Sequence, residues 1–222
     1  DWIGGWGGEG GKRRIVRLEH PASGSTDARE VATMFKSGFR DVSTKKLLAL
    51  LSHPDQRIRF AAQFELARRR VTDALIANAN NAKSQLARLH SIWGLWQLGL
   101  GKRLPPSKIT QVRQLIHHDD SETRAQAAKV LGEIGGSESA DDVIKLLQDD
   151  SPRVRYFAAV AIARIRGDAA VPAVVEMLRS NADKDVSLRN AGVLALSNSA
   201  SASQLGKLKE SPSDAVRRAA VL

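Results

Sequence analysis

The densest group of potential metal ligands in the sequence is the run His117, His118, Asp119 and Asp120. Imidazole and carboxylate groups bind zinc and similar ions when several of them converge on one point. Adjacent residues of a helix point about 100° apart, so His117 and His118 do not readily share one ion. Asp120 also stands where a helix is expected to begin, and a carboxylate there caps the first turn. A structural role is therefore favoured over a metal site.

Other patterns that carry chemistry are missing. The chain has no cysteine, which excludes disulfides, thiolate zinc sites, iron–sulfur clusters and covalently attached haem. It has no Gly-x-Ser-x-Gly, no His-Glu-x-x-His and no glycine-rich loop before Lys-Ser or Lys-Thr. Helical-repeat hydroxylases that bind two irons use His-Glu pairs, and the dipeptide does not occur. We therefore expect no catalytic, cofactor-binding or metal-binding residues in this chain.

Six arginines recur along the chain, separated by 29, 36, 31, 34 and 28 residues. We call them the column arginines; they are Arg59, Arg88, Arg124, Arg155, Arg189 and Arg217. Each is followed three residues later by Ala, Ser or Gly. The arginines could line one groove as a ligand-binding ladder. Because their spacing follows the repeat, we favour a structural ladder that ties one repeat's turn to the next through Asp and backbone carbonyls.

A second set of residues stands four positions before these arginines, and all its members are typical helix N-caps. They are Asp55, Ser84, Asp120, Ser151, Asp185 and Ser213. A shorter segment with helical apolar spacing lies between successive caps, so each repeat is expected to be helix, turn, helix. The sequence predicts an all-α fold, an α-solenoid of about five to six repeats over residues 27–222. A linker at 19–26 and a short irregular or β tail, with a strand at 14–18, are expected before it.

Most of the net charge of +10 lies in residues 44–107, which carry eleven Lys or Arg against three acids. A solvated face is the simpler interpretation, and an acidic protein or a polyanion is the alternative partner. Trp93 and Trp96 lie three residues apart and therefore share a helix face. Their rings are expected to fill the core, and the alternative is that they anchor a partner. The candidate interaction residues are therefore Arg57, Arg68, Arg69, Arg70, Lys83, Trp93, Trp96, Lys102 and Arg103.

The stretches LLSHPDQRIRFAAQFELA (50–67) and LLQDDSPRVRYFAAVAIA (146–163) resemble HEAT repeats, close to the short bacterial kind found in phycobilisome lyases. A narrower resemblance lies in AQFELARR (62–69), LARLHSIWGLWQLG (86–99) and the first 21 residues. These are similar to bacterial membrane-bound dehydrogenases, in which a quinoprotein-type propeller precedes helical repeats and a cytochrome c domain follows.

That resemblance implies that residues 1–18 are a remnant of the propeller. It also implies that residues 27–222 are a non-catalytic scaffold that spaces and docks redox domains of a larger extracytoplasmic, periplasmic protein. Quinone and haem would belong to other domains of that parent. The alternative is an independent binding module that uses residues 44–107 on nucleic acid or another polyanion. A weaker one is a lyase-like or hydroxylase-like enzyme built on the repeats. No specific nucleic acid is expected as partner, and the longest strictly apolar run is too short for a membrane span.

Overall fold

The computed structural model describes residues 26–222, and every regular element among them is helical. The predicted all-α fold is confirmed. The strand predicted at 14–18, the segment 1–18 and the linker up to residue 25 lie outside the described residues. The chain divides into two compact units, Asp1–Phe39 and Arg40–Leu222. In the first unit the described residues form α1, Thr26–Ser37.

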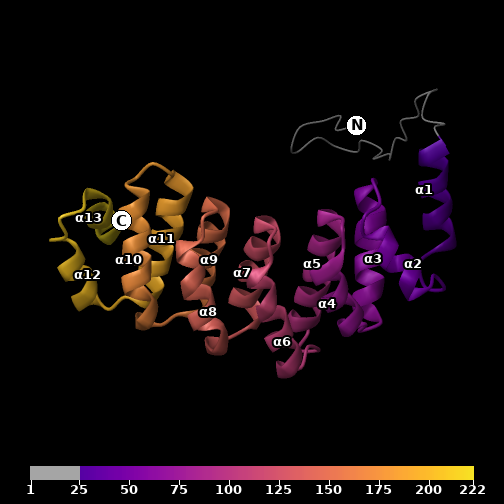
Figure 1. Ribbon diagram of the computed structural model, residues 1–222, viewed down its shortest axis with the longest axis horizontal. Helices are drawn as coiled ribbons and strands as arrows, with labels where there is room; N and C mark the ends of the chain where they lie inside the picture. Colours follow the sequence, from indigo (N-terminus) through magenta and orange to yellow (C-terminus); the bar gives the residue numbers. More distant parts are fainter. Residues whose placement is uncertain (1–25) are drawn as a thin grey trace, which may run out of the picture. The chain divides into compact units, whose positions relative to one another are not determined.

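The second unit, Arg40–Leu222, consists of six helix pairs that follow one another in chain order (Figure 1). The first helices of the pairs are α2 (Thr44–Leu50), α4 (Thr72–Asn81), α6 (Pro106–Arg113), α8 (Ala140–Lys145), α10 (Val171–Asn181) and α12 (Ala202–Leu208). The second helices are α3 (Gln56–Arg68), α5 (Gln85–Leu100), α7 (Ser121–Ile134), α9 (Pro152–Ile165), α11 (Val186–Ser199) and α13 (Asp214–Val221). Short 3-10 turns occupy Gln114–His117, Ser137–Ser139, Leu146–Gln148 and Asp168–Ala170.

The six predicted caps occupy the N-cap positions of the six second helices. Four of them accept a hydrogen bond from a backbone N–H of the first turn through the side chain; these are Asp55, Ser84, Asp120 and Asp185. Such a bond satisfies an N–H that the helix itself leaves unpaired. These four caps therefore set where α3, α5, α7 and α11 begin.

The second helices stack on one another, α3 on α5, α5 on α7, and so on to α13. The small residues three positions after the column arginines are all buried in this stack; they are Ala62, Ser91, Ala127, Ala158, Gly192 and Ala220. Helices α7 and α9 approach closely, since a Cβ added to Gly132 would lie 2.6 Å from Cα of Ala161. Small side chains at these positions let successive repeats pack closely.

The first helices supply the other half of the core. Leu47, Leu75 and Leu178 lie in α2, α4 and α10, whereas Leu115 and Leu147 lie in the 3-10 turns that follow α6 and α8; each of the five is fully buried. Each pair thus buries its apolar faces against its own partner and its neighbours, which is how a repeat array builds a continuous core. Within residues 26–222, no helix is long and apolar enough to cross a membrane.

Candidate interaction surface

The column arginines reach back to the turn that precedes their own helix. In the third repeat, Nη1 of Arg124 donates to the carbonyl oxygens of His118 and Asp119, both at 2.9 Å. The same donation to carbonyls six and five residues earlier, at 2.7–3.1 Å, is made by Arg59, Arg88 and Arg155. These carbonyls lie in the turn between the two helices of a repeat. The guanidinium groups therefore close that turn.

The last two column arginines deviate from this pattern. Arg217 donates to the carbonyl of Ser211 at 2.6 Å, six residues earlier. Nη1 of Arg189 instead lies 3.9 Å from the carboxylate of Asp183. Nε of Arg189 is buried without a hydrogen-bond partner among the described residues. The turn of the fifth repeat is thus held more loosely by its arginine.

Two of the column arginines also donate to the second helix of the following repeat. Nε of Arg59 donates to Nε2 of His90 at 3.0 Å, and Nε of Arg88 donates to Oγ1 of Thr123 at 3.2 Å. Arg88 additionally pairs with the carboxylate of Asp120 at 3.2 Å. These contacts join the first repeat to the second and the second to the third.

The strongest of these links joins Arg124 to Asp149 of the fourth repeat. Nε and Nη2 of Arg124 donate to the two carboxylate oxygens of Asp149 at 2.8 and 2.9 Å. Burial acts to raise the pKa of Asp149, but the hydrogen bonds from Arg124 and from the N–H of Ser151 outweigh it and the pKa is lowered. Asp149 is therefore a carboxylate held ionised between two repeats.

Sequence reasoning missed a third periodic position, six residues before the column arginine. There the side chains of His53, His118, Asp149 and Ser211 accept the backbone N–H of the N-cap residue, at 2.9–3.3 Å. The chemical types differ, although each offers an acceptor two residues before a cap. That shared acceptor character was the available signal. The position explains why His118 stands where it does.

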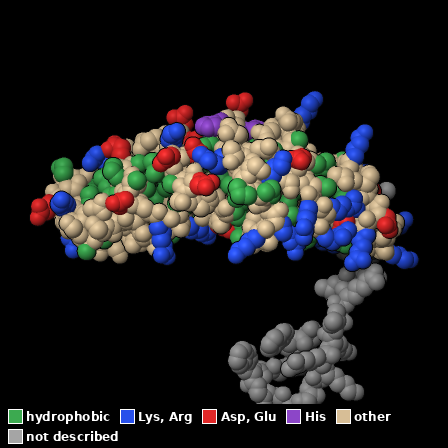
Figure 2. Space-filling view, turned by 90° about the horizontal axis from the view of Figure 1, so that it is seen from below, with side chains coloured by type: hydrophobic (Ala, Val, Ile, Leu, Met, Phe, Trp, Pro, Cys, Tyr) green, Lys and Arg blue, Asp and Glu red, His purple; other side chains and the backbone are tan. Residues whose placement is uncertain are grey.

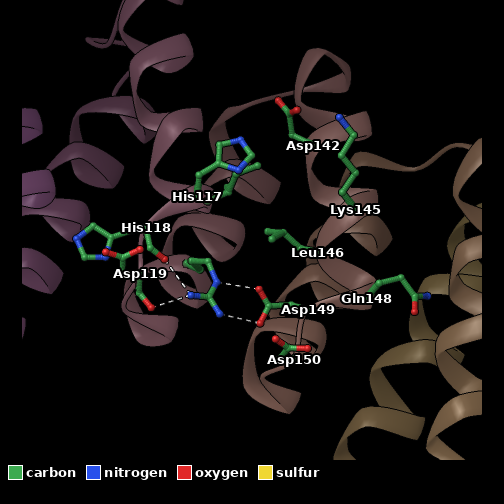
Figure 3. A pocket seen from close by; sticks show the side chains of 11 residues that line it. His117, His118, Asp119, Asp142, Lys145, Leu146, Gln148, Asp149 and Asp150 are labelled. Carbon is green, nitrogen blue, oxygen red and sulfur yellow. Dashed lines mark hydrogen bonds and ion pairs between the residues drawn. The ribbon is translucent and has the colours of Figure 1, made fainter.

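A cavity of about 520 Å³ opens at the turns of the third and fourth repeats (Figure 3). His117, Asp142 and Lys145 lie on one side of it, and Asp119 and Asp150 lie on the other. Nδ1 of His118 accepts from the backbone, so its Nε2–H donates to the carbonyl of Asn80 at 3.2 Å. No group of three or more His, Cys, Asp or Glu within residues 26–222 is arranged to hold a metal ion.

The exposed face of the second helices carries a different row, five positions after each of the first five column arginines. We call it the second-helix ridge; it consists of Phe64, Trp93, Lys129, Val160 and Leu194. Phe64 is 53% exposed and Leu194 is 46% exposed, whereas the three residues between them are half-buried. Four of the five are apolar. The ridge therefore presents two large apolar side chains, Phe64 and Leu194, to solvent.

Hydrogen bonds across α5, α7 and α9 hold Trp93, the ridge residue of α5, in place. Nε1–H of Trp93 donates to Gln126 Oε1 at 3.0 Å, and Gln126 donates to Glu122 at 2.8 Å. Glu122 in turn accepts from Arg153 on α9. The tryptophan is thus neither a fully buried core residue nor a free side chain, because a chain of polar contacts fixes its ring.

A parallel set of contacts lies one turn further along the same helices. Nε1–H of Trp96 donates to Glu133 at 2.5 Å, and Arg164 donates to the other carboxylate oxygen of Glu133 at 2.6 Å. Trp96 is half-buried. Both tryptophans therefore bond α7, and the structure brings them together on one side of α5.

An aromatic cluster connects α3 to α5. Phe64 stacks on Phe60, Phe60 meets His90 edge to face, and His90 meets Trp93 edge to face, with centroids 4.9–6.0 Å apart. His90 is 1% exposed. Because its Nε2 accepts from Arg59, its Nδ1–H donates to Gln63 Oε1 at 2.7 Å. Burial, helped by the charge of Arg59, lowers the pKa of His90 to about 4.

The basic candidate residues fall at both ends of the second helices. At the start of α3, Arg57 pairs with its own cap, Asp55, and lowers the pKa of that carboxyl to about 2. At the end of α3, Arg68 and Arg69 both bind Glu65, at 2.6 and 2.7 Å. The remaining four are exposed and make no ion pair with the described residues; they are Arg70, Lys83, Lys102 and Arg103. Figure 2 shows Lys and Arg gathered over the earlier repeats.

Comparison with known proteins gives one family and one fold. The family model described as HEAT repeats matches residues 72–147 and 109–197. The complex of CpcE and CpcF of phycocyanin lyase from Nostoc sp. PCC7120 is similar in structure, with a TM-score of 0.52 and 19% identity over 68% of this chain. The chain spans 62% of that protein's length. An engineered protein has a TM-score of 0.50 and 20% identity over 81% of this chain and 96% of its own. No curated protein is significantly similar in sequence.

Proposed function

The chain belongs to the HEAT-repeat family, and from that premise we propose that it is a non-catalytic scaffold that docks protein domains on the exposed face of its second helices. The observation that carries the proposal is the second-helix ridge. Apolar side chains on a regular, internally bonded array are typical of protein-interaction surfaces, where large apolar and aromatic residues act as anchors. The full pattern of two turn-carbonyl hydrogen bonds, made by Arg59, Arg88, Arg124 and Arg155, supports the regular shape of the first four repeats.

The larger setting is part of the proposal. Residues 1–18 would end a propeller, 19–26 would be a linker, and 27–222 would be the helical region of a membrane-bound dehydrogenase outside the cytoplasm. The motifs quoted above support this. The chain has no cysteine and therefore cannot attach a c-type haem, so haem would reside in another domain of the parent. The resemblance assigns quinone to another domain as well. Its own task would be to space and dock those domains.

Binding of nucleic acid or another polyanion to residues 44–107 is the second candidate. The excess of eleven cations over three acids in that segment favours it. Several of those cations are already committed, however. Arg59 and Arg88 bind turn carbonyls, and Arg68 and Arg69 bind Glu65. The apolar side chains of the ridge also do not complement a charged phosphate backbone, so protein docking is the better-supported function.

Calorimetry on the full 222-residue chain tests the proposal, using the propeller and cytochrome domains of the parent as ligands. We expect at least one of them to bind. Leu194→Glu on the ridge should weaken that binding at least tenfold, since it places a charge in the apolar contact. Thr110→Glu, on an exposed position of α6, adds the same charge away from the ridge and should leave binding unchanged.

Two results would count against the proposal. If neither domain binds, or if both variants bind like the unsubstituted chain, the proposal of docking on the ridge is wrong. If duplex DNA instead binds tightly at physiological salt, the polyanion candidate replaces it, because phosphate contacts normally weaken steeply as salt rises.

A further inference from the structure

A surface of mixed character lies where α3 and α5 end. We call it the basic–apolar patch; it consists of Phe64, Arg68 and Arg70 from the first repeat and Leu100, Lys102 and Arg103 from the second. Phe64 and Leu100 are each 53% exposed. The side chain of Arg68 is 57% exposed, and the other three residues are exposed as well. Two large apolar side chains therefore stand in solvent beside four cations.

The two halves of the patch adjoin each other. Helices α3 and α5 pack side by side, and the aromatic cluster from Phe64 to Trp93 runs between them. Arg70 lines a cavity of about 410 Å³ together with Pro105, which follows the end of α5 in the chain. The turns after the two helices thus form one surface.

Little negative charge opposes these cations within the described residues. Glu65 is buried and binds Arg68 and Arg69. The hydrogen bonds from Arg68 lower the pKa of Glu65 to about 2, because together with the bond from Arg69 they outweigh the opposite effect of burial. Asp73 is exposed and already pairs with Lys108. Arg70, Lys102 and Arg103 make no ion pair with residues 26–222. The patch therefore keeps a positive field available to a partner.

Two of the cations occupy backbone positions that favour glycine. Arg70 has φ 56° and Lys102 has φ 52°. At the turn after α7, Gly136 has φ 58°. Left-handed backbone crowds the Cβ of any residue other than glycine. Arginine and lysine at these two turns therefore make the fold less stable than glycine would. Strain of this kind is commonly found at functional sites, where the side chain serves a purpose outside the fold.

We propose that the basic–apolar patch binds an acidic, amphipathic segment of a protein partner, with its carboxylates on Arg70, Lys102 and Arg103 and its apolar side chains on Phe64 and Leu100. The proposal rests on the scaffold function and names the partner chemistry of its first two repeats. A nucleic acid backbone would match the cations but would leave Phe64 and Leu100 uncovered. A wholly apolar partner would leave the cations unmatched.

The experiment selects ligands for the full chain from a displayed library of random 16-residue peptides. The enriched peptides should carry excess Asp and Glu together with Leu, Ile, Phe or Trp. Fluorescence anisotropy with a labelled enriched peptide then measures affinity for Phe64→Ser and for the double variant Arg70→Gly/Lys102→Gly. Each should weaken binding about tenfold, and Thr110→Ser on α6 should not.

The double glycine variant separates binding from folding. Because glycine relieves the left-handed strain, its melting temperature should rise while its affinity falls. A loss of affinity through misfolding would instead lower both.

Three results of the peptide experiment overturn the inference. These are a selection that enriches no peptide or only non-acidic ones, peptide binding that the variants leave unchanged, and a 20-base-pair DNA duplex that outcompetes the peptide at 150 mM salt. Parent domains that lose binding with Leu194→Glu but not with the double glycine variant would leave the scaffold function standing and remove only this patch.

Discussion

Arg124 in the third repeat and Asp149 in the fourth form a two-bond ion pair in which both side chains are largely shielded from solvent, 19% and 10% exposed. The same guanidinium closes the turn of its own repeat through the carbonyls of His118 and Asp119. One side chain therefore fixes the turn within a repeat and the junction between two repeats. The stability of the array is expected to depend strongly on it.

The first prediction concerns this pair. Arg124→Ala leaves two turn carbonyls without their donor and leaves the shielded carboxylate of Asp149 with only the N–H of Ser151, and loss of one partner of a buried pair costs about 3–5 kcal/mol. We expect the free energy of unfolding in urea to fall by about 3 kcal/mol. Arg153→Ala is the control, since Arg153 binds Glu122 with its side chain 58% exposed and such pairs contribute at most about 1 kcal/mol. Equal losses in the two variants would contradict the assigned role of Arg124.

The repeats were predictable because two independent patterns, the column arginines and the N-caps, share one period. Each obeys local chemistry that a sequence displays directly. The acceptor position of His53 and Asp149 was not recognised, because different side chains satisfy the same N–H. Hydrogen bonding can be met by several residue types, and a pattern defined by residue identity therefore misses it.

The surface was less predictable than the fold. The bond from Trp93 to Gln126 depends on which helices stack and in what register, and α5 and α7 carry no pairwise signal for it. The left-handed backbone of Arg70 was equally hidden, since the usual sequence signal for that conformation is glycine. Both features follow from tertiary packing, not from local preference.

The second prediction concerns His90 and pH. Its pKa in the folded chain is about 4, below the ordinary value of 6.5, so between these values the unfolded chain binds more protons. Stability should therefore fall as pH is lowered from 6.5 toward 4, by up to about 1.4 kcal/mol per pH unit. His90→Gln, which can still accept from Arg59, should reduce that slope in urea titrations at pH 7, 6 and 5. An unchanged slope would show that His90 is not the group responsible.

The third prediction concerns Glu65 at lower pH. Its pKa of about 2 lies below the ordinary 4.5, chiefly because Arg68 and then Arg69 bind the carboxylate against the effect of burial. The stabilisation is complete above pH 4.5 and is lost as pH falls toward 2. Glu65→Gln should therefore be less stable than the unsubstituted chain at pH 7, and the difference in free energy of unfolding should shrink at pH 3. A difference that stays constant between the two pH values would rule out the charge of Glu65 as its source.

The last prediction concerns the contact between α7 and α9. An alanine Cβ at Gly132 would lie 2.6 Å from both Cα and Cβ of Ala161, so backbone must shift to admit it. Overpacking of this kind typically costs about 1–3 kcal/mol, which exceeds the gain in helix propensity of about 1 kcal/mol. Gly132→Ala should thus lower the melting temperature. Gly206→Ala is the matched control, because Gly206 lies within α12 and an added Cβ meets nothing within 4 Å. There only the propensity gain remains, so this variant should melt higher than the parent chain. If Gly132→Ala also melted higher, the close approach of α7 and α9 would be wrong, and with it the packing that aligns the second-helix ridge.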